Sequence, residues 1–343
     1  MRSRIVRASL IAFVLLAMFA SGASAGTDGP GTSTGTGQVF LPNPVAYLGD
    51  QSLTDQKDAN FPALQPAYKT VTLTNLDGSG YLRGDWANIL NETSHAAFSS
   101  TNTFIYTRDD DRFEQVMAYF WVTEAQKYIQ GLGFGTTYGS INMESQDIRI
   151  NQLGIDNSYS WDKHDVLRFG KGGVDDAEDA EVILHEYGHA IQDSQMDPFG
   201  FGTSVEAGSI GEGFGDYFAV TVSTVIAPTS DPACVADWDS VSYTSATPHC
   251  LRRVDTALHY PEDLNGKVHH DGQIWSRALW DIRNALGNVK ADTIILQAQF
   301  SFAPDTSMPA AAQATVDTAE ALYNHSTAMT VRQAFVDRGI LGP

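Results

Sequence analysis

The sequence has few basic residues. Lysine and arginine together number 21 against 41 aspartates and glutamates, and the formal net charge is −20. A chain this acidic would be repelled by nucleic acid and by anionic membrane surfaces, so we expect neither as a partner. The acidity is explained most simply by the solubility of an exported protein, and a specific basic partner is the less favoured alternative.

Long hydrophobic runs are also missing beyond the N-terminus. Residues 8–20 are apolar and follow three arginines within residues 1–7, but the run is short for a membrane span. Residues 23–25, Ala-Ser-Ala, then supply the small side chains of a cleavage site. The pattern predicts a secretory signal peptide over residues 1–25, removed after Ala25, and a soluble mature protein outside the cytoplasm. Its removal takes away three positive charges and no negative one.

Cysteine is nearly absent, since Cys234 and Cys250 are the only two. In an oxidising compartment we expect them to form one disulfide that closes a short loop. A zinc-binding role is disfavoured because neither has a cysteine or histidine at ligand spacing, apart from His249. The chain also lacks an Asp-x-Asp-x-Asp-Gly calcium loop, so any calcium would have to be bound by other carboxylates.

What the chain does contain is a His-Glu-x-x-His pattern within residues 181–195. Apolar residues at helical spacing, and acids at 175, 176, 178 and 179 before them, predict a helix with negative charge at its N-terminal end. On that helix His185 and His189 share one face, with Cβ atoms about 5–6 Å apart, so both can bind one zinc ion. Glu186 lies beside them, where a carboxylate can take a proton from metal-bound water.

A second predicted helix supplies a third ligand. Residues 206–219 place Glu212 and Asp216 one turn apart on one face. Glu212 can complete a His-His-Glu site, because catalytic zinc usually has three protein ligands. Asp216 can accept a hydrogen bond from the outer N–H of a ligand histidine and fix its orientation.

These two segments together resemble the gluzincin metallopeptidases of the thermolysin type, and Gly-Glu-Gly-x-x-Asp at residues 211–216 is nearer to the fungalysin branch. The resemblance extends over roughly residues 150–285. It implies an α+β fold with a β-rich N-terminal lobe, a helical C-terminal lobe and the zinc-binding helix between them. It also implies zinc as cofactor, calcium as in relatives, and a protein or peptide substrate. We expect a monomer.

The resemblance implies roles for three more residues. Residues 268–275 are similar to a Val-His-x-x-Gly-x-x-Trp segment whose histidine stabilises the transition state, and the spacing selects His269 over His270. Arg252 matches the arginine that holds the substrate carbonyl. Asn157 matches a residue of the edge strand that pairs with bound peptide, formed here by residues 157–161 and 169–173.

One feature of this site departs from the family pattern. No tyrosine lies between His189 and Glu212, where thermolysin itself has a second oxyanion donor, so that role is unassigned. Asp263, six residues before His269, is our candidate to orient that histidine. A preference for apolar side chains after the cleaved bond is implied by the family likeness alone.

The rest of the chain divides by composition. Residues 26–37, rich in glycine and threonine, predict a flexible leader. Residues 38–95 predict a β-rich segment, either a propeptide remnant or part of the mature enzyme. Residues 39–47, with two prolines, predict an extended surface segment, and residues 70–74, 77–78 and 81–82 predict a hairpin. We expect residues 96–200 to form the N-terminal catalytic lobe with the zinc helix, and residues 201–343 the C-terminal helical lobe.

Helical periodicity is clear in five further stretches. The aromatic and aliphatic spacing after residues 109–111 predicts a helix that ends near residue 131. The same reasoning predicts helices over 275–286, 291–301, 311–324 and 330–338, the last starting at Thr330. We interpret the aromatic stripe of the first as core packing.

Our leading hypothesis is a secreted zinc endopeptidase in which Glu186 is the general base. One alternative is a catalytically silent extracellular binding protein stabilised by zinc, which the missing tyrosine and the lack of a long propeptide would favour. The intact Glu186 argues against it, because a structural site has no use for a base. Another alternative is a hydrolase with a narrow peptide specificity.

Overall fold

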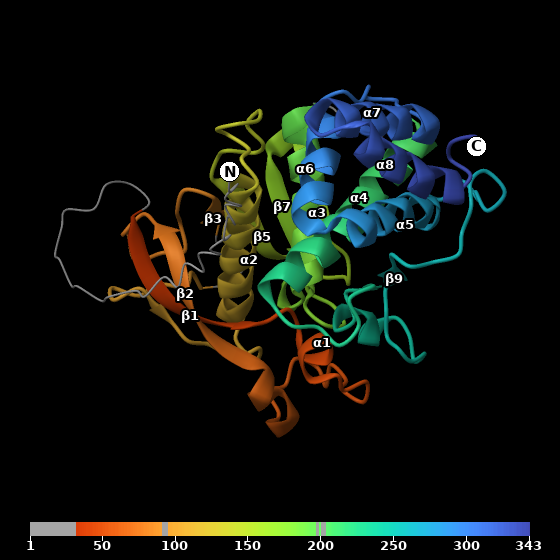
Figure 1. Cartoon of the computed structure of the whole chain (residues 1–343). Helices are drawn as coiled ribbons and strands as arrows, with labels where there is room; N and C mark the ends of the chain where they lie inside the picture. The colour runs from red at the N-terminus through yellow and green to blue at the C-terminus, as the bar shows by residue number, and fades with distance from the viewer. Residues whose placement is uncertain (1–31, 91–94, 197–198, 200–203) are drawn as a thin grey trace, which may run out of the picture.

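The computed structural model describes residues 32–90, 95–196, 199 and 204–343. The predicted signal peptide and residues 26–31 of the predicted leader lie outside the described residues. The fold has the expected α+β, two-lobe form (Figure 1). Strands and one long helix, α2 (Arg112–Gly131), make the N-terminal lobe, helices make the C-terminal lobe, and the predicted zinc helix lies between them as α3 (Ala180–Gln195).

The first sheet has the order β2-β1-β4 and lies against α2. Strand β1 (Ser33–Phe40) is antiparallel to β2 (Tyr68–Leu76) and parallel to β4 (Thr103–Phe104). The prediction of a flexible leader is therefore wrong for residues 33–37. Its glycines allow close packing instead, since a Cβ at Gly37 would lie 2.8 Å from Val116 Cγ1 of α2 and one at Gly35 would lie 2.5 Å from the Asn102 carbonyl oxygen.

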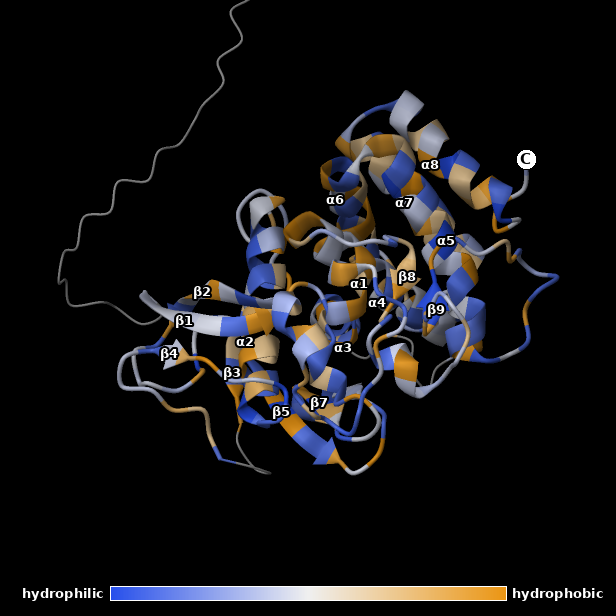
Figure 2. Cartoon of the chain, turned by 90° about the horizontal axis from the view of Figure 1, so that it is seen from below, coloured by the Kyte–Doolittle hydropathy of each residue, from blue (hydrophilic) through white to orange (hydrophobic). Residues whose placement is uncertain are grey.

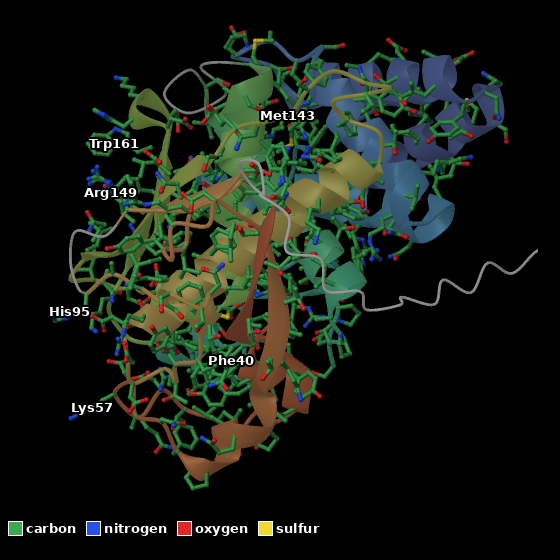
Figure 3. The ribbon with its side chains drawn as sticks, turned by 90° about the vertical axis from the view of Figure 1, so that its left-hand side faces the viewer. Phe40, Lys57, His95, Met143, Arg149 and Trp161 are labelled. Atoms are coloured by element: carbon green, nitrogen blue, oxygen red, sulfur yellow. A yellow bond between two sulfur atoms is a disulfide. The ribbon has the colours of Figure 1, made fainter. Side chains whose placement is uncertain are left out.

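The segment that follows β1 is buried and partly helical, against the prediction of an extended surface segment over residues 39–47. Asn43 caps helix α1 (Pro44–Leu48) by accepting a hydrogen bond from the Ala46 N–H, and Pro44 occupies the first turn, where a missing N–H costs nothing. Phe40 is fully buried. Its ring centroid lies 4.8 Å from that of Phe113 in α2. In Figure 3, Phe40 lies within the body of the N-terminal lobe, whereas Lys57 lies at its edge.

The predicted hairpin is also wrong, because β2 pairs with β1 rather than with residues 81–82. Beyond the turn, Tyr81 forms only an isolated bridge with Phe98, and Leu76 forms one with Gly84. The alternating pattern of β2 predicts a strand but does not say where its partner lies, and the paired residues of β1 lie 28 (Phe40 and Tyr68) to 43 (Ser33 and Leu76) positions earlier in the chain.

The second sheet has the order β3-β5-β7-β6. Strands β3 (Ala87–Ile89), β5 (Gln146–Leu153) and β7 (Val166–Gly170) are parallel, and β6 (Tyr159–Trp161) is an antiparallel edge strand. The two segments predicted to form a substrate-pairing edge therefore lie next to each other as β6 and β7. One edge of β6 is left without a strand partner among the described residues.

Three long helices carry the site and pack closely because of glycines. Asp179 caps α3, and Ser204 caps α4 (Val205–Ile226). A Cβ at Gly188 of α3 would lie 3.1 Å from the Gly215 Cα of α4, and one at Gly213 would lie 2.3 Å from the Gly272 carbonyl oxygen of α5 (Val268–Leu286). The three helices therefore lie side by side (Figure 1).

The three remaining predicted helices are present, but each begins earlier than predicted. They are α6 (Asn288–Gln299), α7 (Met308–Leu322) and α8 (His325–Asp337). Helix α8 begins under an Asn324 cap, not at Thr330, and α5 begins seven residues earlier than predicted. In Figure 2, hydrophobic and hydrophilic residues alternate along α7 and α8, as expected for helices that cover a core with one face.

The predicted disulfide is present. Cys234 of the short strand β8 (Cys234–Val235) is bonded to Cys250, which lies two residues before β9 (Arg252–Arg253), and β8 and β9 pair antiparallel next to α4. In the described part of the chain, every helix is too short or too polar to cross a membrane.

Candidate active site

The predicted metal ligands converge at the contact of α3 with α4. The Nε2 atoms of His185 and His189 lie 3.2 Å apart, and the Glu212 carboxylate oxygens lie 3.3 Å from His185 Nε2 and 3.9 Å from His189 Nε2. All three residues are buried. Two ligand atoms at roughly 2.0–2.1 Å from one zinc ion, at a tetrahedral angle, are about 3.4 Å apart. The observed spacings fit that requirement.

The polar contacts in this cluster also point to a metal. The Nε2 atoms of His185 and His189 face each other, and at most one proton can lie between them. In addition, Glu212 Oε2 has no well-aligned hydrogen-bond partner among the described residues. A buried carboxylate oxygen without a donor is costly. A bound cation between the three side chains would satisfy all of them, and two nitrogens with one carboxylate are ligands that zinc prefers.

The second predicted carboxylate, Asp216, lies behind the first histidine. Its Oδ1 is 2.9 Å from His185 Nδ1, so the ring can donate from this atom and present Nε2 to a metal. Gly215 makes room for the ring, since a Cβ there would lie 2.7 Å from His185 Nδ1. Arg252 donates from Nε and Nη2 to both Asp216 oxygens at 2.7 Å. The sequence assigned Asp216 and Arg252 separate roles and did not predict this pairing.

Burial and neighbouring charges shift the pKa values of the buried site residues in different directions. Burial opposes a charge on His185, yet the hydrogen bonds with Asp216 and Glu212 raise its pKa to about 10. Burial lowers the pKa of His189 to about 4. Burial also raises the pKa of Glu186 to about 7, and the charge on His185 opposes that rise. The cluster therefore attracts positive charge at His185, while Glu186 is held as a base of intermediate strength.

His269 lies in the first turn of α5 and lines both cavities beside the metal cluster. Its Nε2 is 3.3 Å from Glu212 Oε2, and its side chain is 63 % exposed, so it borders the site from the solvent side. His270 instead contacts the Asp271 carboxylate at 3.0 Å. Asp263 accepts a hydrogen bond from the His259 N–H, which leaves it in a local turn and gives no support for our prediction that it orients His269.

Two cavities meet at these residues. The larger, about 340 Å³, runs from the metal cluster along β6 and is lined by Asn157, Tyr159 and Ser160. The narrower, about 80 Å³, lies between α3 and the chain around β8 and β9. His185, Glu186, His269 and Asn157 line both. Asn157 lies two residues before β6 and lines both cavities, and Arg252 lines the narrower one.

Three residues of the narrower cavity were missed. Asp176 was interpreted as helix N-terminal charge, but Asp179 alone caps α3 and Asp176 faces the cavity. Asp239 and Tyr243 come from the loop after β8. The Tyr243 hydroxyl donates to Asp156 at 2.6 Å, so it does not fill the unassigned oxyanion role. No local pattern marked Asp239 or Tyr243, because tertiary folding brings them to the cavity.

A buried His-His-Glu cluster with a neighbouring glutamate, held between a β-rich and a helical lobe, defines the thermolysin-like class of zinc metallopeptidases. Within that class the chain belongs to the fungalysin metallopeptidase family (M36), whose profile matches residues 83–342. It is therefore a zinc metalloendopeptidase by family. Comparison with curated proteins gives no match.

A solved structure supports the same fold. The chain is similar to the precursor of protealysin, a metalloproteinase from Serratia proteamaculans, with a TM-score of 0.53 and 17 % sequence identity. The similarity covers 75 % of this chain and 85 % of that one. At this identity the likeness concerns the fold, and the family assignment is carried by the matched residues 83–342.

Proposed function

We propose that the protein is a secreted endopeptidase in which Glu186 is the general base for hydrolysis of a peptide bond. The observation that carries the proposal is the position of Glu186, which is buried at the junction of the two cavities, beside the converging side chains of His185, His189 and Glu212. These three would hold the zinc. When bound, zinc polarises the substrate carbonyl and lowers the pKa of water to roughly 7.

The protein's own residues supply the proton transfers. Glu186 takes a proton from the attacking water and then delivers it to the leaving amine nitrogen. His269 donates a hydrogen bond to the carbonyl oxygen as negative charge develops there. Arg252 uses Nε and Nη2 for Asp216, and we assign the contact with a substrate carbonyl to its remaining nitrogen, Nη1.

The free edge of β6 is our proposed platform for the substrate backbone. An extended peptide laid along Tyr159–Trp161 would add a strand to the second sheet. Asn157, which precedes this strand and lines both cavities, would hold the peptide by its side-chain amide. The scissile bond would then lie over Glu186.

Maturation is proposed to remove only the signal peptide, after Ala25. Apolar side chains of the described part of residues 38–95, from Val39 and Phe40 to Ile89, pack into the same core as α2, and Asn43 donates to the Asp179 carboxylate at the start of the zinc helix. This packing favours a part of the mature enzyme over a propeptide remnant. We propose secretion to the outside of the cell and a monomeric enzyme.

Calcium stays a proposal without an assigned site. One acidic group, Asp111, Glu114 and Asp175, already has the Lys171 ammonium 2.7 Å from Asp111 and 3.6 Å from Asp175. Another group includes Cys234 and Cys250, whose sulfurs are in the disulfide.

The proposed function is tested by metal removal from the purified mature protein. We expect a chelator to abolish casein hydrolysis and added zinc to restore it. Hydrolysis by the metal-free protein would contradict the proposal. A zinc-dependent melting temperature without cleavage of casein or of a peptide mixture would favour the silent binding protein, and cleavage of very few peptides would favour the narrow hydrolase.

A further inference from the structure

The narrower cavity has an acidic floor. It opens beside Glu186 and His185, and Asp176 and Asp239 contribute to its lining. Asp156 lies next to them, and the three residues each place a carboxylate oxygen within 4.8 Å of the others. Asp176 precedes α3, Asp239 follows β8 and Asp156 precedes β6, so tertiary folding brings them together.

Two of these carboxylates are buried and incompletely bonded. Asp176 is 2 % exposed and Asp239 3 % exposed, and Oδ1 of each has no hydrogen-bond partner among the described residues. Asp176 Oδ2 accepts a hydrogen bond from the Ser158 hydroxyl, and Tyr243 donates to Asp156. A buried carboxylate oxygen without a donor costs free energy unless a ligand satisfies it.

The negative charge of this floor is not neutralised by the protein. Among the described lining residues, the cationic side chains of Arg252 and His185 both already pair with the Asp216 carboxylate. Glu181 also borders the cavity, but Ser223 and the Ala236 N–H satisfy its oxygens. Burial raises the pKa of Asp176 to about 7, so the cavity needs a cation for its carboxylates to be ionised together.

The position of the cavity indicates that the cation comes from a substrate side chain. His185, Glu186, Arg252 and His269 line it, so its contents lie next to the bond that Glu186 would hydrolyse. Its volume of about 80 Å³, against about 340 Å³ for the larger cavity, suits one side chain rather than a stretch of peptide. A substrate side chain that enters beside the scissile bond would bring its terminal group toward the acidic floor.

We propose that the narrower cavity selects a lysine or arginine side chain flanking the cleaved bond, through Asp176, Asp239 and Asp156. This inference rests on the proposed function and replaces the apolar preference that the family resemblance implied. A cationic side chain in the cavity would compensate the negative charge of these carboxylates, and a neutral side chain of equal length would leave that charge uncompensated.

The first test is cleavage-site mapping with the zinc-loaded wild-type protein on a denatured protein mixture. We expect lysine or arginine to be enriched at one position beside the cleaved bond. A mapped peptide with lysine at that position is then compared with its norleucine analogue, which keeps the chain length and removes the ammonium. We expect kcat/KM to be about tenfold or more higher for lysine. Enrichment of apolar residues, or equal cleavage of the two peptides, would overturn the proposal.

Variants locate the preference in the cavity. Asp176→Asn and Asp239→Asn keep the side-chain shape and should each reduce the lysine-to-norleucine ratio by about tenfold or more. Asp305→Asn is the matched control, because it removes an exposed carboxylate in the loop between α6 and α7 that lines neither cavity. An unchanged ratio in both cavity variants, or the same fall in the control, would overturn the assignment.

Two further arms separate the other outcomes. Titration of both peptides into the zinc-loaded Glu186→Gln protein measures the preference without turnover, and we expect tighter binding of the lysine peptide. Equal binding overturns the pocket assignment, whereas tighter binding of lysine with no cleavage by the wild type supports the assignment and overturns the proposed function. If millimolar calcium suppresses cleavage of the lysine peptide alone, a metal ion is the occupant and the proposal fails.

Discussion

Asp216 Oδ1 lies 2.9 Å from Nδ1 of His185, and the same carboxylate accepts two hydrogen bonds from Arg252. One buried acid on α4 therefore fixes both a predicted metal ligand on α3 and a predicted substrate-binding residue on β9. The proposed metal site and the proposed substrate site therefore share hydrogen bonds to a single side chain.

This link predicts a loss of zinc affinity in Asp216→Asn. The amide keeps the shape but removes the charge that orients His185, so we expect zinc affinity to fall by about 10- to 100-fold. Competition with a fluorescent zinc chelator measures the change. Asp263→Asn is the control, because the Asp263 carboxylate accepts a hydrogen bond from a local backbone N–H, that of His259. Equal affinity of Asp216→Asn and the wild type would show that Asp216 does not support the ligand.

A second prediction concerns the oxyanion donor. His269→Gln should lower kcat by about 10²- to 10³-fold with little effect on stability, because the ring is 63 % exposed and its proposed contact forms in the transition state. His270→Gln, the adjacent histidine, serves as the matched control for steady-state peptide hydrolysis. A larger loss in the His270 variant would mean that the wrong histidine was assigned.

A third prediction tests whether the N-terminal sheet belongs to the enzyme. The Phe40 ring is fully buried, 4.8 Å from the Phe113 ring, so Phe40→Ala should lower the free energy of unfolding by about 3–5 kcal/mol. Phe98 is 54 % exposed, so Phe98→Ala should lower the free energy of unfolding by about 1 kcal/mol or less. Urea unfolding of the mature protein measures both. If both variants lost only about 1 kcal/mol of unfolding free energy, the N-terminal sheet would not be needed by the folded enzyme.

A fourth prediction concerns pH and Asp237, which is buried in the loop after β8. Burial, and next the charge on Asp179, raise the pKa of Asp237 from 3.8 to about 8. Between these values the folded state keeps a proton that the unfolded state has released. Stability therefore falls as pH rises through this window, by up to ~1.4 kcal/mol per pH unit.

Asp237→Asn cannot titrate and should lack this part of the dependence. Unfolding free energies in calcium-free buffer, measured between pH 5 and pH 8 for both proteins, should converge or cross as pH rises. Parallel curves would show that Asp237 is ionised in the folded protein throughout this range.

The sequence predicted the site best where its residues are close in the chain. His185, Glu186 and His189 share one helix, and Glu212 and Asp216 share the next, so helical spacing alone places each set on one face. Glycines at 188 and 215 then bring the two helices together, which the motif implied only through the family resemblance.

Non-local features were harder to predict. Residues 33–37 were assigned to a leader because glycine and threonine suggest flexibility, yet those glycines allow β1 to lie against α2. The acids at 176 and 239 meet in one cavity although 63 positions separate them, and no spacing rule joins a residue before α3 to one after β8. The local cue for Asp176, a run of acids before a helix, favoured a capping role instead.

The measurement that tests the account most directly compares wild type with Glu186→Gln at equal zinc occupancy. The variant keeps the three proposed zinc ligands and removes only the proposed base. We expect it to remain folded and zinc-bound while its kcat/KM for a peptide substrate falls by about 10²- to 10⁴-fold. Undiminished cleavage by a zinc-loaded Glu186→Gln protein would contradict the account, because the water would then be activated by some other group.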